Sequence, residues 1–165
     1  MIPAIEHAYP RQVILITSRA EINHFGKKTV KDNIMAASWH SPVSFEPPLY
    51  SIFVGKTRFT YQLIKKSQVF AVNFMSIDNQ KEVLYCGSYT GENINKFEKS
   101  GLTKKECEKI DCPYIGEALA YIECSVQEEV EVGDHILFAG KILKSKKIKE
   151  GKRIFQDKDD FITTK

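Results

Sequence analysis

The chain has 165 residues, of which 42% are hydrophobic and 27% are charged, close to the composition of an ordinary globular domain. This apolar content excludes intrinsic disorder as the main state, and no apolar run approaches the ~20 residues of a membrane span. The N-terminus has no basic start followed by an apolar stretch, so the sequence predicts no signal peptide. We expect a soluble, cytoplasmic protein with a single domain over residues 1–165.

Positive charge is concentrated near the C-terminus. Lys and Arg total 24 and Asp and Glu total 21, a net charge of +3 that is too balanced to predict nucleic-acid binding. Residues 141–165 nevertheless hold nine basic and four acidic side chains. The basic cluster at 144–153 is interpreted first as a solvated strand end and loop, and second as a surface that attracts an anionic cofactor or dinucleotide.

The four cysteines and four histidines show no metal-ligand spacing. No Cys-x-x-Cys pair occurs, four residues separate Cys107 from Cys112, and no histidine lies at a zinc-ligand distance along the chain. In a cytosolic chain of this size, separate reduced thiols are the default. Cys124 falls on the apolar phase of a predicted strand. The sequence therefore predicts neither a metal site nor a disulfide framework.

The N-terminal half predicts strands with proline-containing breaks. Apolar and β-branched runs indicate strands at 12–18, 33–39, 49–54 and 69–75. Prolines at 42, 47 and 48 forbid a continuous central strand and imply a loop or the entry to an edge strand. Between the last two runs, residues 58–66 predict a helix with Thr57 as its N-cap.

Two more short helices are predicted in the middle of the chain. Residues 78–85 begin with Asp78 as a cap, and residues 92–100 place apolar side chains on one face and end at Gly101. Glycine suits the left-handed residue that follows a helix.

The clearest alternation lies at 120–132, where one face holds Ala120, Ile122, Cys124, Val126, Val130 and Val132. The other face, with Glu123, Glu129 and Glu131, is predicted to be acidic and wet. Gly133-Asp134 then turns the chain into a strand at 136–143, which completes a hairpin. Many strands and few short helices predict a mainly antiparallel barrel, and the absence of G-x-G-x-x-G argues against a Rossmann fold.

The segment Gly55–Thr60 is the first candidate functional site. Glycine permits a close backbone approach, and the free N–H groups of a first helical turn favour an anion. Lys56 and Arg58 add positive charge, and Thr57 adds a hydroxyl donor like that of Thr60. The pattern is typical of a phosphate cradle, but an ordinary helix start with exposed basic residues explains it equally well.

Small residues beside the only tryptophan make Asn33–His40 the second candidate. A flat ring such as a flavin or a nucleobase needs close peptide groups and an aromatic or apolar wall. A strand of small residues packed tightly on its neighbour explains the same residues more simply.

His135, in the turn Gly133-Asp134-His135, is either a solvent-exposed turn residue or presents its imidazole to a ligand. No G-x-S-x-G motif and no Cys–His arrangement supports hydrolase chemistry.

Several ordered segments together carry a family resemblance. They are Asn33–Trp39, Pro47-Pro48-Leu49, Val54–Ile64, Phe70–Phe74, Leu84–Leu102, Ile122–Cys124 and Gly133–Gly140. From about Pro10 to Leu143 the chain resembles the flavin reductase-like family with the FMN-binding split barrel, which includes flavoredoxin.

The resemblance implies a six-stranded antiparallel split β-barrel and a homodimer with one FMN per subunit. It implies that Asn33–Trp39 backs the isoalloxazine ring, that Gly55–Thr60 holds the phosphate, and that the Cys86–Lys96 region borders the cofactor. His135, the one residue named as catalytic, would lie where a nicotinamide docks. The cofactor-binding residues implied are Asn33, Met35, Ala36, Ala37, Ser38, Trp39, Gly55, Lys56, Thr57, Arg58, Thr60, Cys86, Ser88 and Lys96.

Two positions depart from the family's pattern. Thr is common where this chain has Ala36, and the frequent S-G-R-D-V-D-K-F stretch appears as residues 90–97 with Glu92 in place of arginine. The second change replaces a positive charge with a negative one, so a phosphate role at Glu92 is in doubt.

The resemblance predicts an FMN-dependent oxidoreductase, either an NAD(P)H-dependent flavin reductase or a flavoredoxin-like electron carrier with a redox partner protein. A non-catalytic FMN-binding redox partner without a nicotinamide site is the alternative. A small nucleic-acid-binding barrel is the third, and the acidic face of the strand at 120–132 disfavours it. We expect no nucleic-acid or membrane partner. The sequence does not identify the electron donor, NADH or NADPH, or the acceptor.

Overall fold

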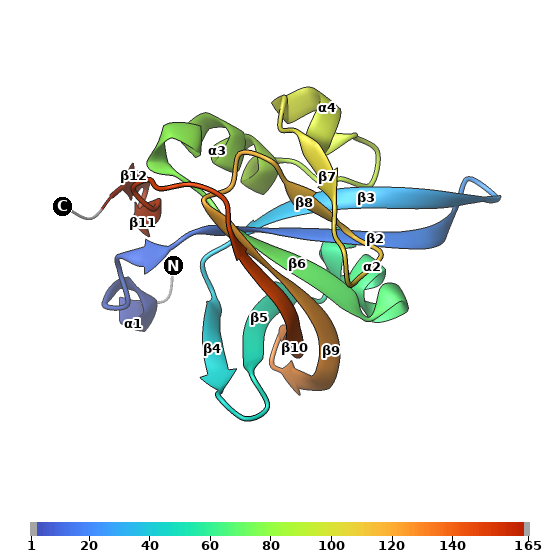
Figure 1. Cartoon of the computed structure of the whole chain (residues 1–165), viewed down its shortest axis with the longest axis horizontal. Helices are drawn as coiled ribbons and strands as arrows, with labels where there is room; N and C mark the ends of the chain where they lie inside the picture. Colours follow the sequence, from blue (N-terminus) through green and yellow to red (C-terminus); the bar gives the residue numbers. More distant parts are fainter. Residues whose placement is uncertain (1–2, 164–165) are drawn as a thin grey trace.

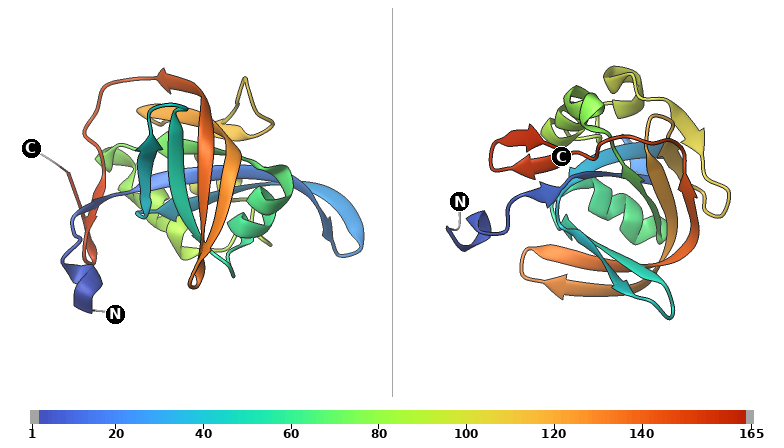
Figure 2. Two further views of the ribbon diagram at one scale, coloured as in Figure 1. Left: turned by 90° about the horizontal axis from the view of Figure 1, so that it is seen from below. Right: turned by 60° about the vertical axis from the view of Figure 1, so that its left-hand side comes forward.

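A seven-stranded antiparallel sheet is the centre of the computed structural model, which describes residues 3–163 (Figure 1). Its spatial order is β3 (Lys27–Ala37), β2 (Ile14–His24), β6 (Val69–Phe74), β9 (Ala120–Val132), β10 (His135–Lys147), β5 (Leu49–Gly55) and β4 (His40–Ser44). The edge strands β3 and β4 are consecutive in the chain, and the sheet curls into an open barrel (Figure 2). The predicted mainly β, antiparallel class is confirmed. The sheet has seven strands instead of six because residues 40–44, including Pro42, pair with β5 as an edge strand.

Helix α2 (Phe59–Ser67) lies within the opening of the curled sheet (Figure 2). Its Ile64 contributes to an inner core formed by Ile14, Ile16, Tyr50, Ile52, Val54, Ile64, Phe70, Val72, Ile122, Cys124, Ile136 and Phe138. Cys124 is fully buried there, as its place on the apolar phase predicted. Burial of these side chains is the main stabilising contribution of the barrel interior.

A second core lies on the outer face of the sheet. The short 3-10 helix η1 (Ile77–Asn79), α3 (Gln80–Ser88) and α4 (Lys96–Ser100) cover this face (Figure 1). The core consists of Val13, Leu15, Ile34, Met75, Val83, Cys86, Phe97, Leu102, Ile115, Ala118 and Ile154. The start of strand β2 is covered on both faces, which explains the continuous apolar run at 13–16 that leads into it.

Three smaller units complete the structure. The ribbon of β7 (Lys104–Glu106) and β8 (Pro113–Ile115) packs on β2 and β6. Both ends of the described chain meet in a three-stranded sheet of β1 (Arg11–Gln12), β11 (Phe155–Asp157) and β12 (Asp160–Ile162), near helix α1 (Pro3–Glu6). Residues 1 and 2, part of the N-terminal segment for which no signal peptide is predicted, lie outside the described residues.

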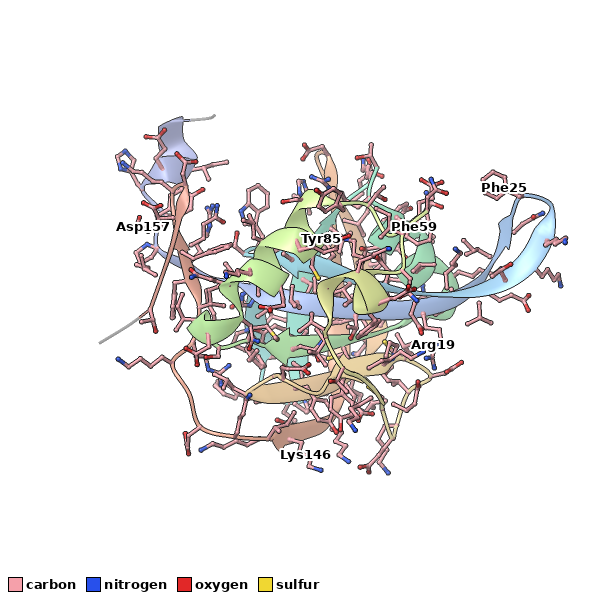
Figure 3. All side chains as sticks on the ribbon, turned by 90° about the horizontal axis from the view of Figure 1, so that it is seen from above. Arg19, Phe25, Phe59, Tyr85, Lys146 and Asp157 are labelled. Carbon is pink, nitrogen blue, oxygen red and sulfur yellow. The ribbon has the colours of Figure 1, made fainter. Side chains whose placement is uncertain are left out.

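The β2–β3 hairpin extends beyond the barrel as an arm (Figures 1 and 3). Its register is regular from the pair Ile14 and Ala37 to the turn. At the turn, Phe25 and Gly26 adopt positive φ angles of 51° and 76°, and the Phe25 side chain is 88% exposed. Figure 3 places Phe25 at the far end of the arm and Arg19 closer to the body.

The predicted helix starts were wrong in detail. Helix α2 begins at Phe59 with Arg58 at the N-cap, and no side chain caps it, so Thr57 is not its cap. Asp78 does not cap a helix either, because Ser76 is the N-cap of η1 and its Oγ accepts from the backbone N–H of Asp78 at 3.2 Å.

Helix α4 is shorter than the predicted helix at 92–100. It begins at Lys96, after Asn95, whose Oδ1 accepts from the backbone N–H of Glu98 at 3.4 Å. It ends as predicted at Gly101, which has a φ of 76°. The left-handed conformation there explains why glycine occupies this position.

The alternation predicted for β9 holds for only part of the strand. Glu123 was expected on a wet face but is fully buried, because its carboxylate accepts the backbone N–H groups of Glu108 (3.1 Å) and Lys109 (2.6 Å). At the other end, Val130 and Val132 were expected to be buried but are exposed. Burial in β9 therefore changes along the strand, from both faces covered to both faces open.

Candidate functional site

Three adjoining cavities follow the C-terminal half of β3. Their volumes are about 200, 430 and 170 Å³, and Ala36 and Arg58 line all three. They lie between β3, the start of α2 and the end of α3. Together these three cavities form one trough, whose two ends differ in chemistry.

The first end of the trough, the 200 Å³ cavity, is cationic. Arg58 and Lys96 line it, and no Asp or Glu is among its lining residues. Thr57 and Thr60 add hydroxyl groups at the start of α2. No side chain caps this helix, and of its first-turn N–H groups Tyr61 donates to the carbonyl of Arg58, which leaves those of Phe59 and Thr60 for a ligand. Positive charge, hydroxyl donors and an open helix start together suit an anionic group such as a phosphate.

Asn33 forms the floor of this cationic end with one polar atom unpaired. Its Nδ2 donates to Thr60 Oγ1 at 2.8 Å, whereas its buried Oδ1 has no hydrogen-bond partner. In the other amide orientation Thr60 donates to Oδ1, and the amide N–H groups have no partner. In either orientation one polar group of Asn33 lies buried and unpaired at the edge of this cavity.

Gly91 closes over Asn33 and leaves no room for a side chain. A Cβ added at Gly91 would lie 1.9 Å from Asn33 Oδ1. We therefore expect Gly91→Ala to displace the Asn33 amide and to lower the free energy of unfolding by about 1–3 kcal/mol. Chemical denaturation measures this effect.

The control for this prediction is the double variant Asn33→Ala/Gly91→Ala. Removing the Asn33 amide removes the clash, so adding the Gly91 change to Asn33→Ala should cost less than about 0.5 kcal/mol. A full cost in the Asn33→Ala background would show that Gly91 acts on something other than Asn33.

Lys96 is a buried ammonium below the cationic end. Its side chain is almost inaccessible, and Nζ donates to the backbone carbonyls of Ile34 and Cys86, each at 2.7 Å. It thus ties β3 to the end of α3. Burial and, to a smaller extent, the nearby Arg58 guanidinium lower the pKa of Lys96 to about 8. An anion in the cavity would favour the charged form.

The middle of the trough is narrow and built from small residues. The 170 Å³ cavity is lined by Met35, Ala36, Ala37, Ser38, Trp39, Phe53, Gly55, Arg58 and His135. A Cβ at Gly87 would lie 3.2 Å from the Ala36 Cβ, so α3 packs closely on β3 at this point. The arrangement provides a slot between a strand backbone and aromatic side chains, as a flat ring requires.

Trp39 and His135 form the wall at the second end of the trough. Their ring centroids are 4.8 Å apart with a tilt of 31°. His135 Nδ1 lies 2.7 Å from Asp134 Oδ1, so Nδ1 donates to the carboxylate and fixes the orientation of the ring. Beyond this wall a more open cavity of about 720 Å³ begins, which also contacts Trp39, Phe53 and His135.

A fixed histidine lines the large cavity. His40 Nε2 lies 2.9 Å from the carbonyl oxygen of Gln12, which can only accept, so Nε2 carries the proton and Nδ1 accepts from the Tyr50 hydroxyl at 2.6 Å. Burial lowers the pKa of His40 and raises that of Tyr50 to about 12. Both groups are therefore neutral at pH 7 and serve as structural polar contacts in the wall.

Most of the predicted site residues line the trough, but Lys56 does not. Its Nζ forms an ion pair with Glu131 on β9, away from the cavities. Cys86 lines the cationic end as a buried thiol, and burial raises its pKa to about 11, so it is protonated at neutral pH. The Ser88 hydroxyl lies at the same end and donates to the carbonyl of Leu84 at 2.8 Å.

Several lining residues were missed by the sequence reasoning. Phe53, Gly87, Tyr89 and Gly91 were not singled out, although two of them are glycines in the segment 84–102 that carries the resemblance. The basic cluster at 144–153 lines none of these cavities. Lys144 and Lys147 instead pair with Glu108 and Glu150.

Neither a metal centre nor a membrane helix is found within residues 3–163. No cluster of three or more His, Cys, Asp or Glu in this part of the chain is arranged to hold a metal ion, and the side chain of His24 lies outside the description. All four cysteines are free thiols. No described helix is long and apolar enough to cross a membrane.

Comparisons with known proteins give a consistent result. The family model described as "Flavin reductase like domain" matches residues 6–159. An uncharacterized protein from Archaeoglobus fulgidus is 40% identical over 139 residues, which are 84% of this chain and 73% of the relative. A relative from Pyrococcus abyssi is 37% identical over 111 residues, 67% of this chain, and the matched part is only 63% of that protein's length.

Solved structures with the same fold include flavin proteins. Flavoredoxin of Desulfovibrio vulgaris (Miyazaki F) has a TM-score of 0.81 at 25% identity, covering 95% of this chain and 88% of that one. The NADH:FAD oxidoreductase SgcE6 of Streptomyces globisporus has a TM-score of 0.81 at 22% identity, with 95% and 87% coverage. At that identity, the second likeness concerns the fold alone.

Proposed function

Because the chain belongs to the flavin reductase-like family, whose members are flavin-binding oxidoreductases, we propose that it binds FMN and passes electrons from a reduced nicotinamide dinucleotide to a flavin or a redox partner protein. The observation that carries the proposal is the trough along β3. It has a carboxylate-free cationic end at an uncapped helix start and a narrow slot of small residues beside Trp39. A cofactor with a phosphate at one end and a planar ring at the other fits this polarity.

The residues of the trough have separate tasks in this proposal. Thr57, Arg58 and Thr60 hold the phosphate, with Asn33 supporting Thr60. The backbone of residues 35–39 lies along the ring. Bound FMN supplies the hydride and electron transfer chemistry, and the protein supplies binding, orientation and exclusion of water.

The second end of the trough is where an electron donor reaches the cofactor. The 720 Å³ cavity adjoins Trp39 and His135 and has the size of a small-molecule site. His135, held by Asp134, places its imidazole at this boundary. This cavity favours the enzyme over the alternative, a non-catalytic FMN-binding redox partner with no nicotinamide site.

A homodimer is part of the proposal. Large side chains beside the trough are exposed: Trp39 by 38%, Leu84 by 59% and Tyr89 by 52%. Tyr85 and Tyr114, which could also have served such a contact, are partly covered, and the ring centroids of Tyr114 and Tyr121 are 4.0 Å apart in a stack. The exposed group supports an apolar contact with a second copy near the cofactor. The expected cytoplasmic location stays a prediction.

The protein is expected to purify yellow, with close to one FMN per chain. Heat release followed by chromatography identifies the flavin, and titration with FMN, FAD and riboflavin ranks the ligands, with FMN expected to bind most tightly. A protein that carries no flavin and binds none of the three contradicts the proposal. Anaerobic mixing with NADH or NADPH then separates the alternatives, since bleaching of the flavin absorbance indicates an enzyme and its absence indicates a redox partner.

A further inference from the structure

The two cysteines nearest each other in sequence face one another across the β7–β8 hairpin. The register pairs Glu106 with Pro113, so the next step outward places Cys107 opposite Cys112. The backbone N–H of Cys107 donates to the carbonyl of Cys112 at 3.0 Å. The backbone N–H of Cys112 donates to Ile110 instead, so only one of the two possible bonds joins the pair. Residues directly opposite each other in an antiparallel pair have side chains on one face and Cα atoms ~4.5–5.5 Å apart. This separation is within the ~4.4–6.8 Å range of disulfides.

The hairpin tip, residues 108–111, is fixed on both sides of the cysteine pair. The buried Glu123 carboxylate accepts two backbone N–H groups from the tip. Asp111 and Glu106 both pair with Arg19 on β2, at 2.9 and 2.7 Å (Figure 3 labels Arg19). The backbone is therefore held in the paired geometry whether or not the two sulfurs are bonded.

The surroundings of the two thiols differ from those of a redox catalyst. Cys112 is fully buried, and its S–H donates to the carbonyl of Thr17 at 3.2 Å, whereas Cys107 is partly exposed. Burial, with the carboxylates of Glu123 and Glu106, raises the pKa of Cys107 to about 12. Catalytic cysteines have lowered pKa values, because their surroundings stabilise the thiolate. Here the thiolate is not stabilised, and such a cysteine pair favours a lasting disulfide.

We propose that Cys107 and Cys112 form an intramolecular disulfide that closes the hairpin tip. The oxidant is a low-molecular-weight disulfide such as oxidised glutathione. The Cys107 thiolate attacks one sulfur of the oxidant and expels the first thiolate. Cys112, after losing its proton, attacks the Cys107 sulfur of the mixed disulfide and expels the second. The two cysteines lose two electrons and two protons, and the oxidant leaves as two thiols.

The disulfide exchanges one weak contact for a covalent constraint. Cys112 gives up its S–H contact with Thr17. In return, the disulfide closes the loop of residues 108–111 in the unfolded chain too, which lowers the conformational entropy of that chain and so stabilises the folded state. The proposal does not depend on flavin binding, because neither cysteine lines the trough. Uncatalysed disulfide exchange takes minutes to hours, and the raised pKa of Cys107 slows it at neutral pH.

The test uses the full chain equilibrated overnight in glutathione buffers of graded potential. Samples are acid-quenched, denatured and alkylated before intact-mass analysis and non-reducing peptide mapping. We expect the number of alkylated thiols to fall from four to two, a single 107–112 cross-linked peptide, and a Tm higher by about 4–8 °C in the oxidised form. Cys107→Ser and Cys112→Ala should each retain their remaining thiols and show no Tm shift on oxidation.

Cys86→Ser is the matched control, because Cys86 is also a free buried thiol but lies far along the chain from the hairpin. It should keep both the cross-link and the Tm shift. Four alkylated thiols under the most oxidising buffer, a stable glutathione adduct on Cys107, or a cross-link to another cysteine would each overturn the proposal. A lower Tm in the cross-linked form would also overturn it, since the bond would then strain the hairpin.

Discussion

FMN affinity is expected to fall about ten- to a hundredfold in Arg58→Ala and in Thr60→Ala, while riboflavin affinity stays nearly constant. Arg58 lines every cavity of the trough and Thr60 is buried at its cationic end. Each would give a phosphate one hydrogen bond, charge-assisted at the dianion, and the loss of such a bond costs about 1.5–3 kcal/mol. Riboflavin has no phosphate, so it reports damage to the ring slot or the fold. Titrations that follow quenching of flavin fluorescence measure both ligands in the same variants.

The chain provides two matched controls for this experiment. Lys56→Ala removes a neighbouring positive charge that pairs with Glu131 outside the trough, so FMN affinity should change less than about threefold. Thr60→Ser keeps the hydroxyl group that accepts from Asn33 Nδ2 and should retain most of the FMN affinity. Equal losses for FMN and riboflavin would indicate a damaged helix start, and full FMN affinity in both alanine variants would place the phosphate elsewhere.

The parts of the site that could be predicted from sequence are local ones. Small residues at 35–38 beside Trp39 indicate a slot, and a glycine followed by basic and hydroxyl residues indicates an anion site at a helix start. Both segments lie in the trough, since the slot is a strand backbone and the anion site is the first turn of α2. Such features depend on a few adjacent residues, so the sequence displays them directly.

Side-chain partners from distant segments could not be predicted in the same way. Lys56 and Arg58 have the same charge and are two residues apart, but Glu131 on β9 draws Lys56 away while Arg58 lines the cavities. Likewise, Asn33 contacts Thr60 and leaves no space for a Cβ at Gly91. Each of these outcomes depends on which segments the fold places side by side.

Burial in β9 was mispredicted for a related reason. The period-2 pattern assigns one face to solvent, but the tip of the β7–β8 hairpin covers that face with two backbone N–H groups that need an acceptor. Glu123 supplies it from a fully buried position. The alternation of apolar and polar residues predicts which side chains face solvent. A loop that covers the polar face and brings N–H groups in need of an acceptor can bury such a side chain instead.

Wild-type FMN affinity is expected to fall as the pH rises above about 8, by up to tenfold per pH unit, while riboflavin affinity lacks this component. The Lys96 ammonium lies under the cationic end, and burial lowers its pKa to about 8. A bound phosphate dianion stabilises the charged form and raises this pKa. Binding therefore takes up a proton wherever Lys96 is neutral in the free protein, which lowers affinity at high pH and leaves it unchanged below the free pKa. The Cys86 thiol, with a pKa of about 11, stays protonated over most of this range.

Lys96→Met tests the assignment, because it removes the charge and keeps an apolar stem of similar length. The FMN affinity of this variant should be low and should not change with pH between about pH 7 and pH 10. It should equal the affinity that the wild type shows at high pH, where Lys96 is neutral. The variant also loses the Nζ hydrogen bonds to Ile34 and Cys86, so its Tm should be lower. Thermal unfolding measures this loss of stability, and riboflavin binding shows whether the ring slot is still intact. Lys99→Met, an exposed change on the same helix, should keep the wild-type pH profile. If FMN affinity changes with pH equally in the wild type and in Lys96→Met, Lys96 does not act on the phosphate. If riboflavin affinity in the wild type changes with pH as FMN affinity does, the titrating group acts on the ring.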